Sequence, residues 1–317
     1  MGGKQFSPKF YISAVEKYDK ICYYIPVDFK TTMGYNMKIK VTSDSTCDLG
    51  QELISKNNIG IFPLTVILGD KSYKDGEISP QDIFDFVAKT GTLPKTAAGS
   101  LEGYTQFFEE NLKGYDALIH FNISSLASSC FNSASKAAEG FGGKVKVIDS
   151  RALSTGQGLL VLKACDLAAE GRSAEEIESE VNSLRAMVNT SFVPDSLEYL
   201  HKGGRCSLAA MLGAKVLKLH PMICENADGQ LIAKKKYMGN MERCIRTYIA
   251  DLKAQYPAYD KTRVFVTHST ADKELVELAK GLVKENFEFD EMIETVAGSI
   301  VTSHCGRNTL GVLFISK

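Results

Sequence analysis

Short apolar runs that end in polar turns recur along the first half of this chain. Residues 38–45, 59–68, 117–123 and 144–150 are predicted to form strands. The first and fourth runs end in serine and aspartate, and two serines follow the third. Segments with helical patterning separate the runs, and the longest of them spans 154–170. Strands that alternate with helices predict a parallel sheet with helices on both faces. Because ligands bind such sheets at the edge where the strands end, we expect a binding site there.

The pattern changes after about residue 172, where strands and helices no longer alternate regularly. We expect strands near 218–225, 230–237, 263–269, 290–298 and 309–316, and helices near 173–188, 208–216, 239–255 and 272–285. The whole pattern predicts an α/β fold in two domains, a parallel-sheet α/β domain at 37–185 and an α+β domain at 186–317. Residues 1–36 stand apart as an extension of unknown role, with a short helix expected near 11–21.

The composition is that of a soluble globular protein, with 44% apolar and 24% charged residues. The net charge of −1 gives no support for nucleic-acid binding. No run approaches the roughly 18 apolar residues of a membrane span, and the N-terminus has no apolar signal core. We therefore expect a cytoplasmic protein without stable membrane insertion. Its eight cysteines and five histidines lack metal-ligand spacing, so we expect neither a metal nor another cofactor.

The most informative segment is the strand at 117–123 together with the turn SSLASSCFNSA that follows it. Ser124, Ser125, Ser128 and Ser129 place hydroxyl groups where a helix is expected to start. Unpaired N–H groups and the helix dipole favour an anion at such a position, and small hydroxyl side chains can donate hydrogen bonds to it. The segment therefore predicts a site for a phosphate or carboxylate group. The alternative interpretation is a helix capped by Ser124 or Ser125 with no ligand.

Three further positions carry groups suited to an anion. Thr96 lies in a predicted loop of small residues at 92–100, where it could also act only as a helix cap. Gly203-Gly204-Arg205 offers close approach and a guanidinium, and its alternative is a helix C-terminus with a surface arginine. His304 is predicted in a loop between two strands, where it could bind an anion, act as a base or serve a structural role. His268, at a strand end, is a weaker candidate of the same kind.

Common catalytic and nucleotide-binding motifs are absent from the sequence. The chain has no GxSxG nucleophile elbow, no Walker A motif and no GxGxxG after a strand. A serine hydrolase or a nucleotide-using enzyme is therefore poorly supported.

The chain resembles the DegV family of bacterial fatty-acid-binding proteins over about residues 37–317. Segments that carry the resemblance follow the family's order and spacing: VTSDSTCDL (41–49), YKDGEISPQDIF (73–84), LPKTAAGS (93–100), ISSLASSCFNSA (123–134), VIDSRALSTGQGLLV (147–161), LEYLHKGGRCS (197–207) and SHCGRNTLGVLF (303–314). Each segment alone is a weak signal, but their common order is specific.

The resemblance implies a two-domain protein that holds one long-chain fatty acid in an apolar tunnel between its domains. It implies that Thr96 and Ser128 bind the carboxylate and that Arg205 and His304 complete the polar network. The supporting residues would be Ser124, Ser125, Ser129, Gly203 and Gly204. Well-understood members carry no catalytic nucleophile. They present the fatty acid to a separate kinase, which makes acyl phosphate from ATP for phospholipid metabolism.

The loops around these residues depart from the usual family pattern. Thr96-Ala97-Ala98-Gly99-Ser100 stands where TSQPS is common, Ser128-Ser129-Cys130 where SGT is common, and His304-Cys305-Gly306-Arg307-Asn308 where HxGxG is common. These differences bear on delivery to a kinase more than on lipid binding.

Two other functions fit the residues: a phosphotransferase or hydrolase that uses His304 or Ser128, and a scaffold that interacts through residues 1–36.

Overall fold

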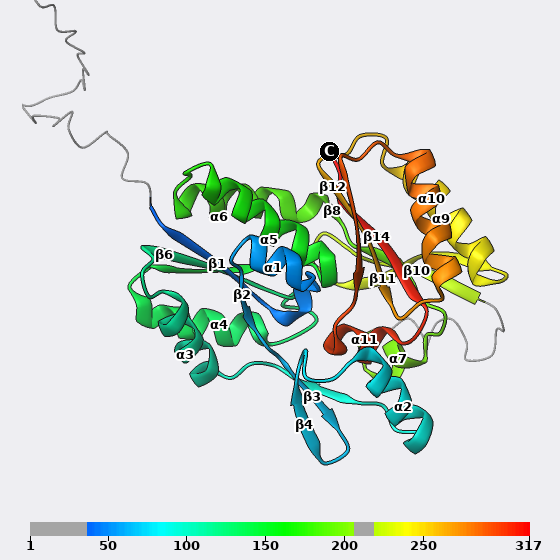
Figure 1. The fold of residues 1–317 in the computed structure, drawn as a ribbon, viewed down its shortest axis with the longest axis horizontal. Helices are drawn as coiled ribbons and strands as arrows, with labels where there is room; N and C mark the ends of the chain where they lie inside the picture. The colour runs from blue at the N-terminus through cyan, green and yellow to red at the C-terminus, as the bar shows by residue number, and fades with distance from the viewer. Residues whose placement is uncertain (1–36, 206–218) are drawn as a thin grey trace, which may run out of the picture. The chain divides into compact units, whose positions relative to one another are not determined.

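The computed structural model of the chain describes residues 37–205 and 219–317. The helices expected near 11–21 and 208–216 lie outside these residues. Within the described residues the chain forms three β-sheets (Figure 1). A parallel sheet lies in the N-terminal half and a mixed sheet in the C-terminal half, which confirms the predicted fold class. The domain limits at 37–185 and 186–317 stay a prediction.

The N-terminal sheet contains four parallel strands, in the order β2 (Gly60–Phe62), β1 (Ile39–Asp44), β6 (Ala117–Asn122) and β7 (Val145–Asp149). Every residue of β6 is buried, because the strand lies between two others and helices cover both faces of the sheet. Hydrogen bonds join the turns after these strands: the backbone N–H of Ile123 donates to Asp44, and that of Ser125 donates to Asp149. The polar turns therefore meet at one edge of the sheet, as the sequence predicts.

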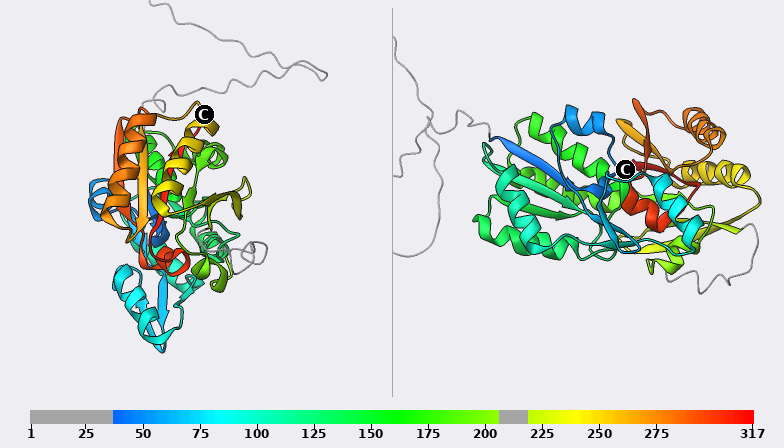
Figure 2. Two further views of the ribbon diagram at one scale, coloured as in Figure 1. Left: turned by 90° about the vertical axis from the view of Figure 1, so that its right-hand side faces the viewer. Right: turned by 60° about the horizontal axis from the view of Figure 1, so that its bottom comes forward.

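Two pairs of helices cover this sheet. Helices α3 (Leu101–Asn111) and α4 (Cys130–Ala138) pack on one face, and α5 (Ser154–Ala169) and α6 (Ala174–Leu184) pack on the other (Figures 1 and 2). The short helix α1 (Gln51–Lys56) follows β1, and single turns of 3₁₀-helix occur at Ser45–Cys47, Glu139–Phe141 and Arg185–Met187.

The C-terminal sheet runs in the order β11 (Leu231–Met238), β10 (Leu219–Glu225), β9 (Ser191–Val193), β14 (Thr309–Ile315), β12 (Arg263–Ser269) and β13 (Glu291–Val296), and β8 (Val188–Asn189) pairs with β14. The β12–β13 pair is parallel and the other pairs are antiparallel. Helices α9 (Met241–Gln255) and α10 (Lys273–Asn286) pack together against this sheet. The strands predicted in this half are present, and β8 and β9 are additional.

Helix α5 lies between the two large sheets. It contacts β1 and β6 of the first sheet and β12 and β14 of the second. Eleven of its sixteen residues are buried, so the helix shows no polar face of the usual kind. Its leucines share one apolar cluster with Val41 of β1, Phe265 of β12 and Leu313 of β14. The two halves of the molecule therefore share part of their core.

A third, antiparallel sheet consists of β4 (Lys71–Lys74), β3 (Thr65–Leu68) and β5 (Lys95–Ala97). The interpretation of residues 59–68 as one strand is wrong, because β2 and β3 belong to different sheets. Pro63 lies between them and has no N–H to donate to a strand ladder, which favours a break at this point. The interpretation of 92–100 as a loop is wrong at its centre, where Lys95–Ala97 pairs with β3 as β5.

Three short helices lie near the junction of the two halves. Helix α2 (Pro80–Thr90) begins with the predicted Ser79-Pro80 start and a capping box between Ser79 and Asp82. Helices α7 (Glu198–Lys202) and α11 (Ser299–Cys305) pack against each other, and α11 also contacts α2, β3 and β5. Helix α11 thus belongs to the C-terminal half by sequence and touches elements of the N-terminal half.

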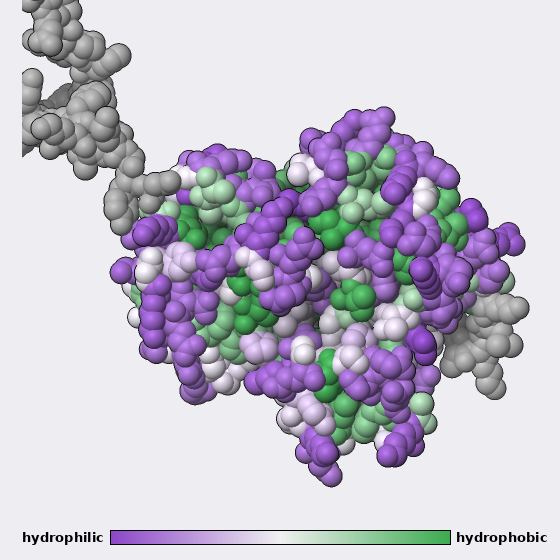
Figure 3. Space-filling model, viewed as in Figure 1, coloured by the Kyte–Doolittle hydropathy of each residue, from purple (hydrophilic) through white to green (hydrophobic). Residues whose placement is uncertain are grey.

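Hydrophilic side chains cover most of the face shown in Figure 3, with apolar residues in smaller patches between them. Among residues 37–205 and 219–317, no helix combines the length and the apolar character needed to cross a membrane.

Candidate functional site

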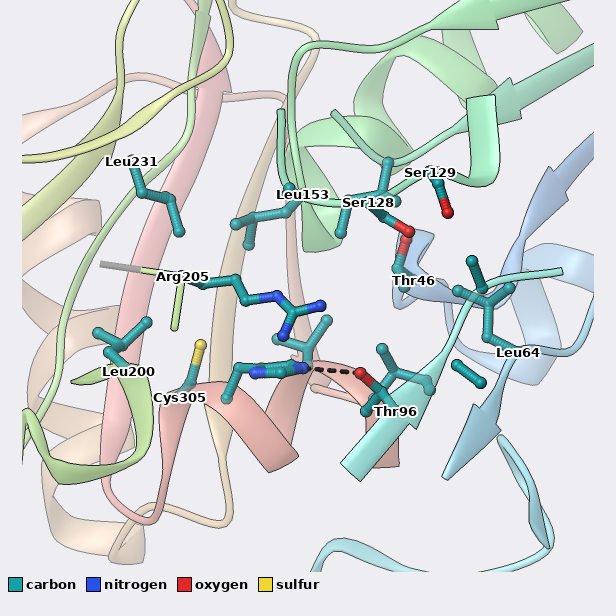
Figure 4. A pocket seen from close by; sticks show the side chains of 17 residues that line it. Thr46, Leu64, Thr96, Ser128, Ser129, Leu153, Leu200, Arg205, Leu231 and Cys305 are labelled. Carbon is teal, nitrogen blue, oxygen red and sulfur yellow. Dashed lines mark hydrogen bonds between the residues drawn. The ribbon is translucent and has the colours of Figure 1, made fainter. Parts of the chain in front are cut away.

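A cavity of about 270 Å³ lies at the junction of the two halves (Figure 4). Its lining combines hydroxyl groups, one guanidinium, one imidazole and many apolar side chains. The described lining residues are Thr46, Leu64, Thr96, Ala97, Ala98, Ile123, Ala127, Ser128, Ser129, Leu153, Leu200, Arg205, Leu231, Ile300, Val301, His304 and Cys305. All four residues that the resemblance assigns to carboxylate binding are in this set.

Ser128 reaches the cavity from the turn between β6 and α4. The backbone N–H of Ser128 donates to the Ser124 carbonyl, which folds the turn back on itself. The Ser128 hydroxyl accepts from the N–H of Cys130 at 3.3 Å and donates to the Cys130 sulfur at 3.1 Å. Sulfur is a weak acceptor, so an anion in the cavity can displace it as the partner of this hydroxyl.

Thr96 and His304 form a hydrogen-bonded pair in the cavity wall. Thr96 lies on β5, opposite Val66 of β3, and its Oγ1 is 2.9 Å from His304 Nε2. His304 lies in the last turn of α11, so its predicted place in a loop between strands is wrong. The helix spans seven residues between a glycine on each side, and such a short apolar segment has no clear helical period.

His304 is neutral at physiological pH. Burial, with the nearby Arg205 charge, lowers its pKa to about 4. Nδ1 has no hydrogen-bond partner among the described residues. With the proton on Nε2, the imidazole donates to Thr96, and the Thr96 hydroxyl hydrogen is then free to be donated into the cavity.

Arg205 is the permanent cation among the described lining residues. In Figure 4 its guanidinium extends from the C-terminal half toward Thr96 and Ser128. Its backbone is shaped by the two preceding glycines, and its Nη1 donates to the Gly203 carbonyl at 2.8 Å. Gly203 also permits the close approach of His304, since a Cβ at Gly203 would lie 2.6 Å from His304 Nδ1. Gly204 adopts a positive φ of 70°.

Of the other serines predicted to support the site, one lines the cavity and two bind neighbouring loops outside it. Ser129 lines the cavity and occupies the N-cap position of α4, where its side chain makes no capping bond. The alternative in which Ser124 or Ser125 caps this helix is therefore wrong. Ser124 donates to the Gly229 carbonyl at 2.7 Å, and Ser125 donates to Asp149 at 2.6 Å. Both hydroxyls hold neighbouring loops and lie outside the lining.

Sequence reasoning did not identify the apolar part of the lining or Thr46. Thr46 lies in the segment 41–49 that carries the resemblance, and its hydroxyl bonds Asp44 and Gln157. The apolar residues come from seven separate segments, so no local pattern marks them. Helix α11 alone supplies Ile300 and Val301 in addition to His304 and Cys305.

Two carboxylates of the N-terminal half bind the start of α11. Asp48 accepts from the N–H of Gly298 at 2.8 Å and from the Ser154 hydroxyl. Asp75 accepts from the N–H and the hydroxyl of Ser299 at 2.8 and 2.6 Å. Both aspartates belong to segments that carry the resemblance, yet the sequence suggested no role for them. They fix the helix whose side chains line the cavity.

The arrangement suits an amphiphilic anion. Hydroxyl groups and Arg205 lie together, and the rest of the lining is mainly apolar. Within the described residues, no group of three or more His, Cys, Asp or Glu side chains is placed to hold a metal ion. Ser128 bonds Cys130 and His304 bonds Thr96, so the described geometry does not pair a serine nucleophile with a histidine base.

Comparison with known proteins agrees with the segments noted in the sequence. The family model described as "Uncharacterised protein, DegV family" matches residues 38–317. The chain belongs to the DegV family. A DegV domain-containing protein of Caldanaerobacter subterraneus subsp. tengcongensis is 33% identical over 281 residues, which cover 88% of this chain and 99% of that protein.

Solved structures of fatty-acid-binding proteins share this fold. The structure described as fatty acid binding of a DegV family protein from Thermus thermophilus is 29% identical, with a TM-score of 0.83, and covers 89% of this chain and 100% of that one. A stearic acid-binding protein from Eubacterium ventriosum is 26% identical, with a TM-score of 0.76, and covers 88% of this chain and 98% of that one. Proteins of similar length and fold are thus described as fatty-acid-binding proteins.

Proposed function

We propose that this DegV family chain binds one long-chain fatty acid in the cavity between its halves. Thr96 and Ser128 donate hydrogen bonds to the carboxylate, Arg205 compensates its charge, and neutral His304 orients the Thr96 hydroxyl. The acyl chain lies against the apolar side chains from both halves. The protein has no catalytic role of its own in this proposal, and it presents the fatty acid to a separate acyl kinase.

The convergence of four distant residues carries the proposal. Thr96, Ser128, Arg205 and His304 come from four separate segments, and all four line one cavity that is otherwise mainly apolar. A buried carboxylate without donors is strongly unfavourable, so a fatty-acid site needs such a cluster at one end. The relatives described as fatty-acid-binding proteins provide independent support.

The energetics favour a long acyl chain. Burial of roughly 14 methylene groups at about 0.8 kcal/mol each gives a gross gain of about 11 kcal/mol. Lost freedom and incomplete desolvation reduce this gain considerably. The polar cluster then fixes the orientation of the ligand, because each good hydrogen bond to a charged group adds about 1.5–3 kcal/mol.

Native mass spectrometry of the purified full-length chain tests the proposal. We expect a mass increment of one fatty acid per chain, and denaturing extraction should release a lipid of long acyl chain. An empty protein that also fails to take up added palmitate or oleate would contradict the proposal. Turnover of acyl esters or phosphorylated substrates by the chain alone would instead support the enzyme alternative.

A further inference from the structure

The two carboxylates that bind the start of α11 lie beside each other. Asp48 Oδ1 accepts from the N–H of Gly298, and Asp75 Oδ1 accepts from the N–H and the hydroxyl of Ser299. A Cβ at Gly298 would lie 3.2 Å from Asp48 Oδ1 and 3.1 and 3.2 Å from the two Asp75 oxygens, so both carboxylates face the same point of the backbone. Asp48 is only 6% exposed, and Asp75 Oδ2 is buried without a hydrogen-bond partner among the described residues.

Neither carboxylate forms an ion pair within residues 37–205 and 219–317. Two neighbouring buried carboxylates without a cation disfavour each other's charge. One proton on Asp48 removes this repulsion and keeps the bonds in place, because Oδ1 can still accept from Gly298 and Oδ2 can donate to the Ser154 hydroxyl. Burial, with a smaller effect of the Asp75 and Asp44 charges, raises the pKa of Asp48 to about 8. The attachment of α11 therefore holds a proton near neutral pH.

Other titratable groups pack around this pair. Asp44, at the end of β1, is buried as well, and burial raises its pKa. Burial raises the pKa of Cys47 and that of Cys305 on α11 to about 12, so both thiols keep their protons. Helix α5 contributes the hydroxyl of Ser154, which does not titrate. Asp44 is thus the group beside Asp48 whose titration an experiment must separate from that of Asp48.

The remaining titratable groups that pack against α11 stay neutral or bind elsewhere. His268 of β12 lies 3.5 Å from a Glu294 oxygen, and its Nδ1 accepts from the N–H of Ala271. His304 has a pKa of about 4, and burial raises the pKa of Tyr199 on α7 above its ordinary value. None of these groups is placed to neutralise Asp48 or Asp75 in the described part of the chain.

We propose that Asp48 and Asp75 form a proton-dependent latch, which holds α11 against the N-terminal half while Asp48 is protonated and releases the proton when the helix separates. Helix α11 carries His304, whose hydrogen bond to Thr96 joins the two halves across the cavity. Separation of the helix should therefore open the cavity wall and let a bound ligand leave. The effect on a fatty acid rests on the proposed function, but the effect on α11 itself does not.

The latch predicts a defined pH window. A separated Asp48 ionises near its ordinary pKa of 3.8, and an attached Asp48 ionises near 8, so rising pH favours separation between these values. The dissociation rate of a bound fatty acid should rise by up to about tenfold per pH unit in this range, since one proton is released, and should level off above about pH 8.

Stopped-flow measurement of the release of cis-parinaric acid, a fluorescent fatty acid, tests this prediction between pH 5.5 and 9. Asp48→Asn keeps an acceptor for Gly298 and a donor for Ser154 but cannot titrate, so its dissociation rate should stay nearly constant. Asp75→Asn keeps the acceptor for Ser299 and removes the neighbouring charge. In that variant the rate should level off at a lower pH than in the wild type, and this variant carries the test if Asp48→Asn does not fold.

Glu225→Gln is the matched control. Burial raises the pKa of Glu225, which lies beside Leu153 of the cavity lining, but Glu225 does not bind α11 in the described contacts. This variant should keep the wild-type pH dependence. A pH dependence that persists in Asp48→Asn would assign it to Asp44, Glu225 or the ligand and would overturn the latch.

Hydrogen exchange of the peptide that spans 297–306 tests the latch without a ligand. In delipidated protein, the exchange of this peptide in the wild type should exceed that in Asp48→Asn by a factor that grows from pH 5.5 to pH 8. Comparison at equal pH removes the intrinsic pH dependence of exchange, and the peptide of α9 should exchange equally in both proteins. Equal exchange at 297–306 at every pH would overturn the latch. If that exchange differs as expected but the chain binds no fatty acid, the proposed function fails and the latch stands.

Discussion

In the proposed site, Thr96 and His304 are two neutral side chains with different roles. His304 is neutral because burial lowers its pKa to about 4, so it cannot supply the charge that balances a carboxylate. It can orient the hydroxyl of Thr96, which lies 2.9 Å away. In the proposal, the compensating charge comes from the exposed guanidinium of Arg205.

Removal of either hydroxyl that we propose to bind the carboxylate should weaken binding without unfolding the chain. For Thr96→Val and for Ser128→Ala we expect the affinity for oleate to fall about 10- to 150-fold, because each variant loses a hydrogen bond of about 1.5–3 kcal/mol to a charged group. Thr96→Ser keeps the hydroxyl and should retain most of the affinity. Isothermal titration calorimetry of delipidated protein gives the affinities.

Ser129→Ala serves as the matched control for Ser128→Ala. The Ser129 side chain is exposed and makes no capping bond, so its loss should change the affinity by less than about threefold. A second control uses the ligand. Affinity for oleyl alcohol, which lacks the charge, should be far less sensitive to Thr96→Val. Equal losses with both ligands would argue against a carboxylate at Thr96.

At the scale of residues, the sequence indicated the polar cluster but not its surroundings. Thr96, Ser128, Arg205 and His304 stand in segments of small or glycine-rich character, so their polar groups are conspicuous. Leu153 and Leu231 are ordinary apolar residues in the sequence, and only the packing of two halves brings them to one cavity. Ser124 and Ser125 look equivalent to Ser128 in the sequence, yet their hydroxyls bond Gly229 and Asp149.

At the scale of elements, two aspartates attach α11 to the N-terminal half. Asp48 and Asp75 accept hydrogen bonds from the first N–H groups of this helix, which lack partners within the helix. Burial, with a smaller effect of the neighbouring Asp75 and Asp44 charges, raises the pKa of Asp48 to about 8. Asp48 is therefore largely protonated at neutral pH, and it can donate to the Ser154 hydroxyl in that form.

The raised pKa of Asp48 makes stability depend on pH in a defined direction. A carboxyl group whose pKa rises from 3.8 to about 8 on folding binds its proton more tightly in the folded chain, so its contribution to stability falls as the pH rises through this range. Asp48→Asn keeps one acceptor and one donor and does not titrate. We expect the variant to be more stable than wild type at pH 8 by about 1–3 kcal/mol, with little difference at pH 5.

Urea unfolding at pH 5 and pH 8 measures this difference. Asp82→Asn is the control of opposite sign, because its hydrogen bonds to Ser79 lower the pKa of Asp82 and stabilise its ionised form. That variant should lose stability by nearly the same amount at pH 5 and pH 8, because the lowered pKa of Asp82 keeps its carboxylate ionised at both values. His304 titrates in the wild type and in both variants, so its contribution to the pH dependence of stability cancels when a variant is compared with the wild type. A constant difference between wild type and Asp48→Asn at the two pH values would contradict the assignment.

Long periodic elements were predictable from the sequence, and short ones were not. Strands β1, β6 and β12 and helices α5, α9 and α10 have enough residues to show a period or a continuous apolar run. Strand β5 has three residues and α11 has seven, so neither shows a pattern of its own. Both exist because neighbours in the fold pair with them: β3 pairs with β5, and Asp48 and Asp75 bind the start of α11.

At the scale of the whole molecule, the two sheets depend on one helix. Helix α5 contacts strands of both sheets, and its leucines pack with Val41, Phe265 and Leu313 in one cluster. Unfolding of either half would expose apolar surface of this helix and remove packing from the other half. We therefore expect the described part of the chain to unfold as one cooperative unit.

Buried cysteines in each half provide a local measure of this cooperativity. Cys130 lies in the apolar core of the N-terminal half and Cys244 in that of the C-terminal half, and both are free and buried. Pulsed labelling with iodoacetamide across a urea titration, with the sites located by peptide mass spectrometry, should give coincident midpoints. Labelling of Cys244 at clearly lower urea than Cys130 would show that the halves unfold separately.

The shared helix also bears on how this architecture can diverge. Side chains of both sheets pack against α5, so a substitution on this helix must fit two interfaces. If two relatives exchanged one half, α5 from one protein would have to pack against a sheet from the other. We therefore expect members of this lineage to be inherited as whole chains, with recombination breakpoints rare along 154–169.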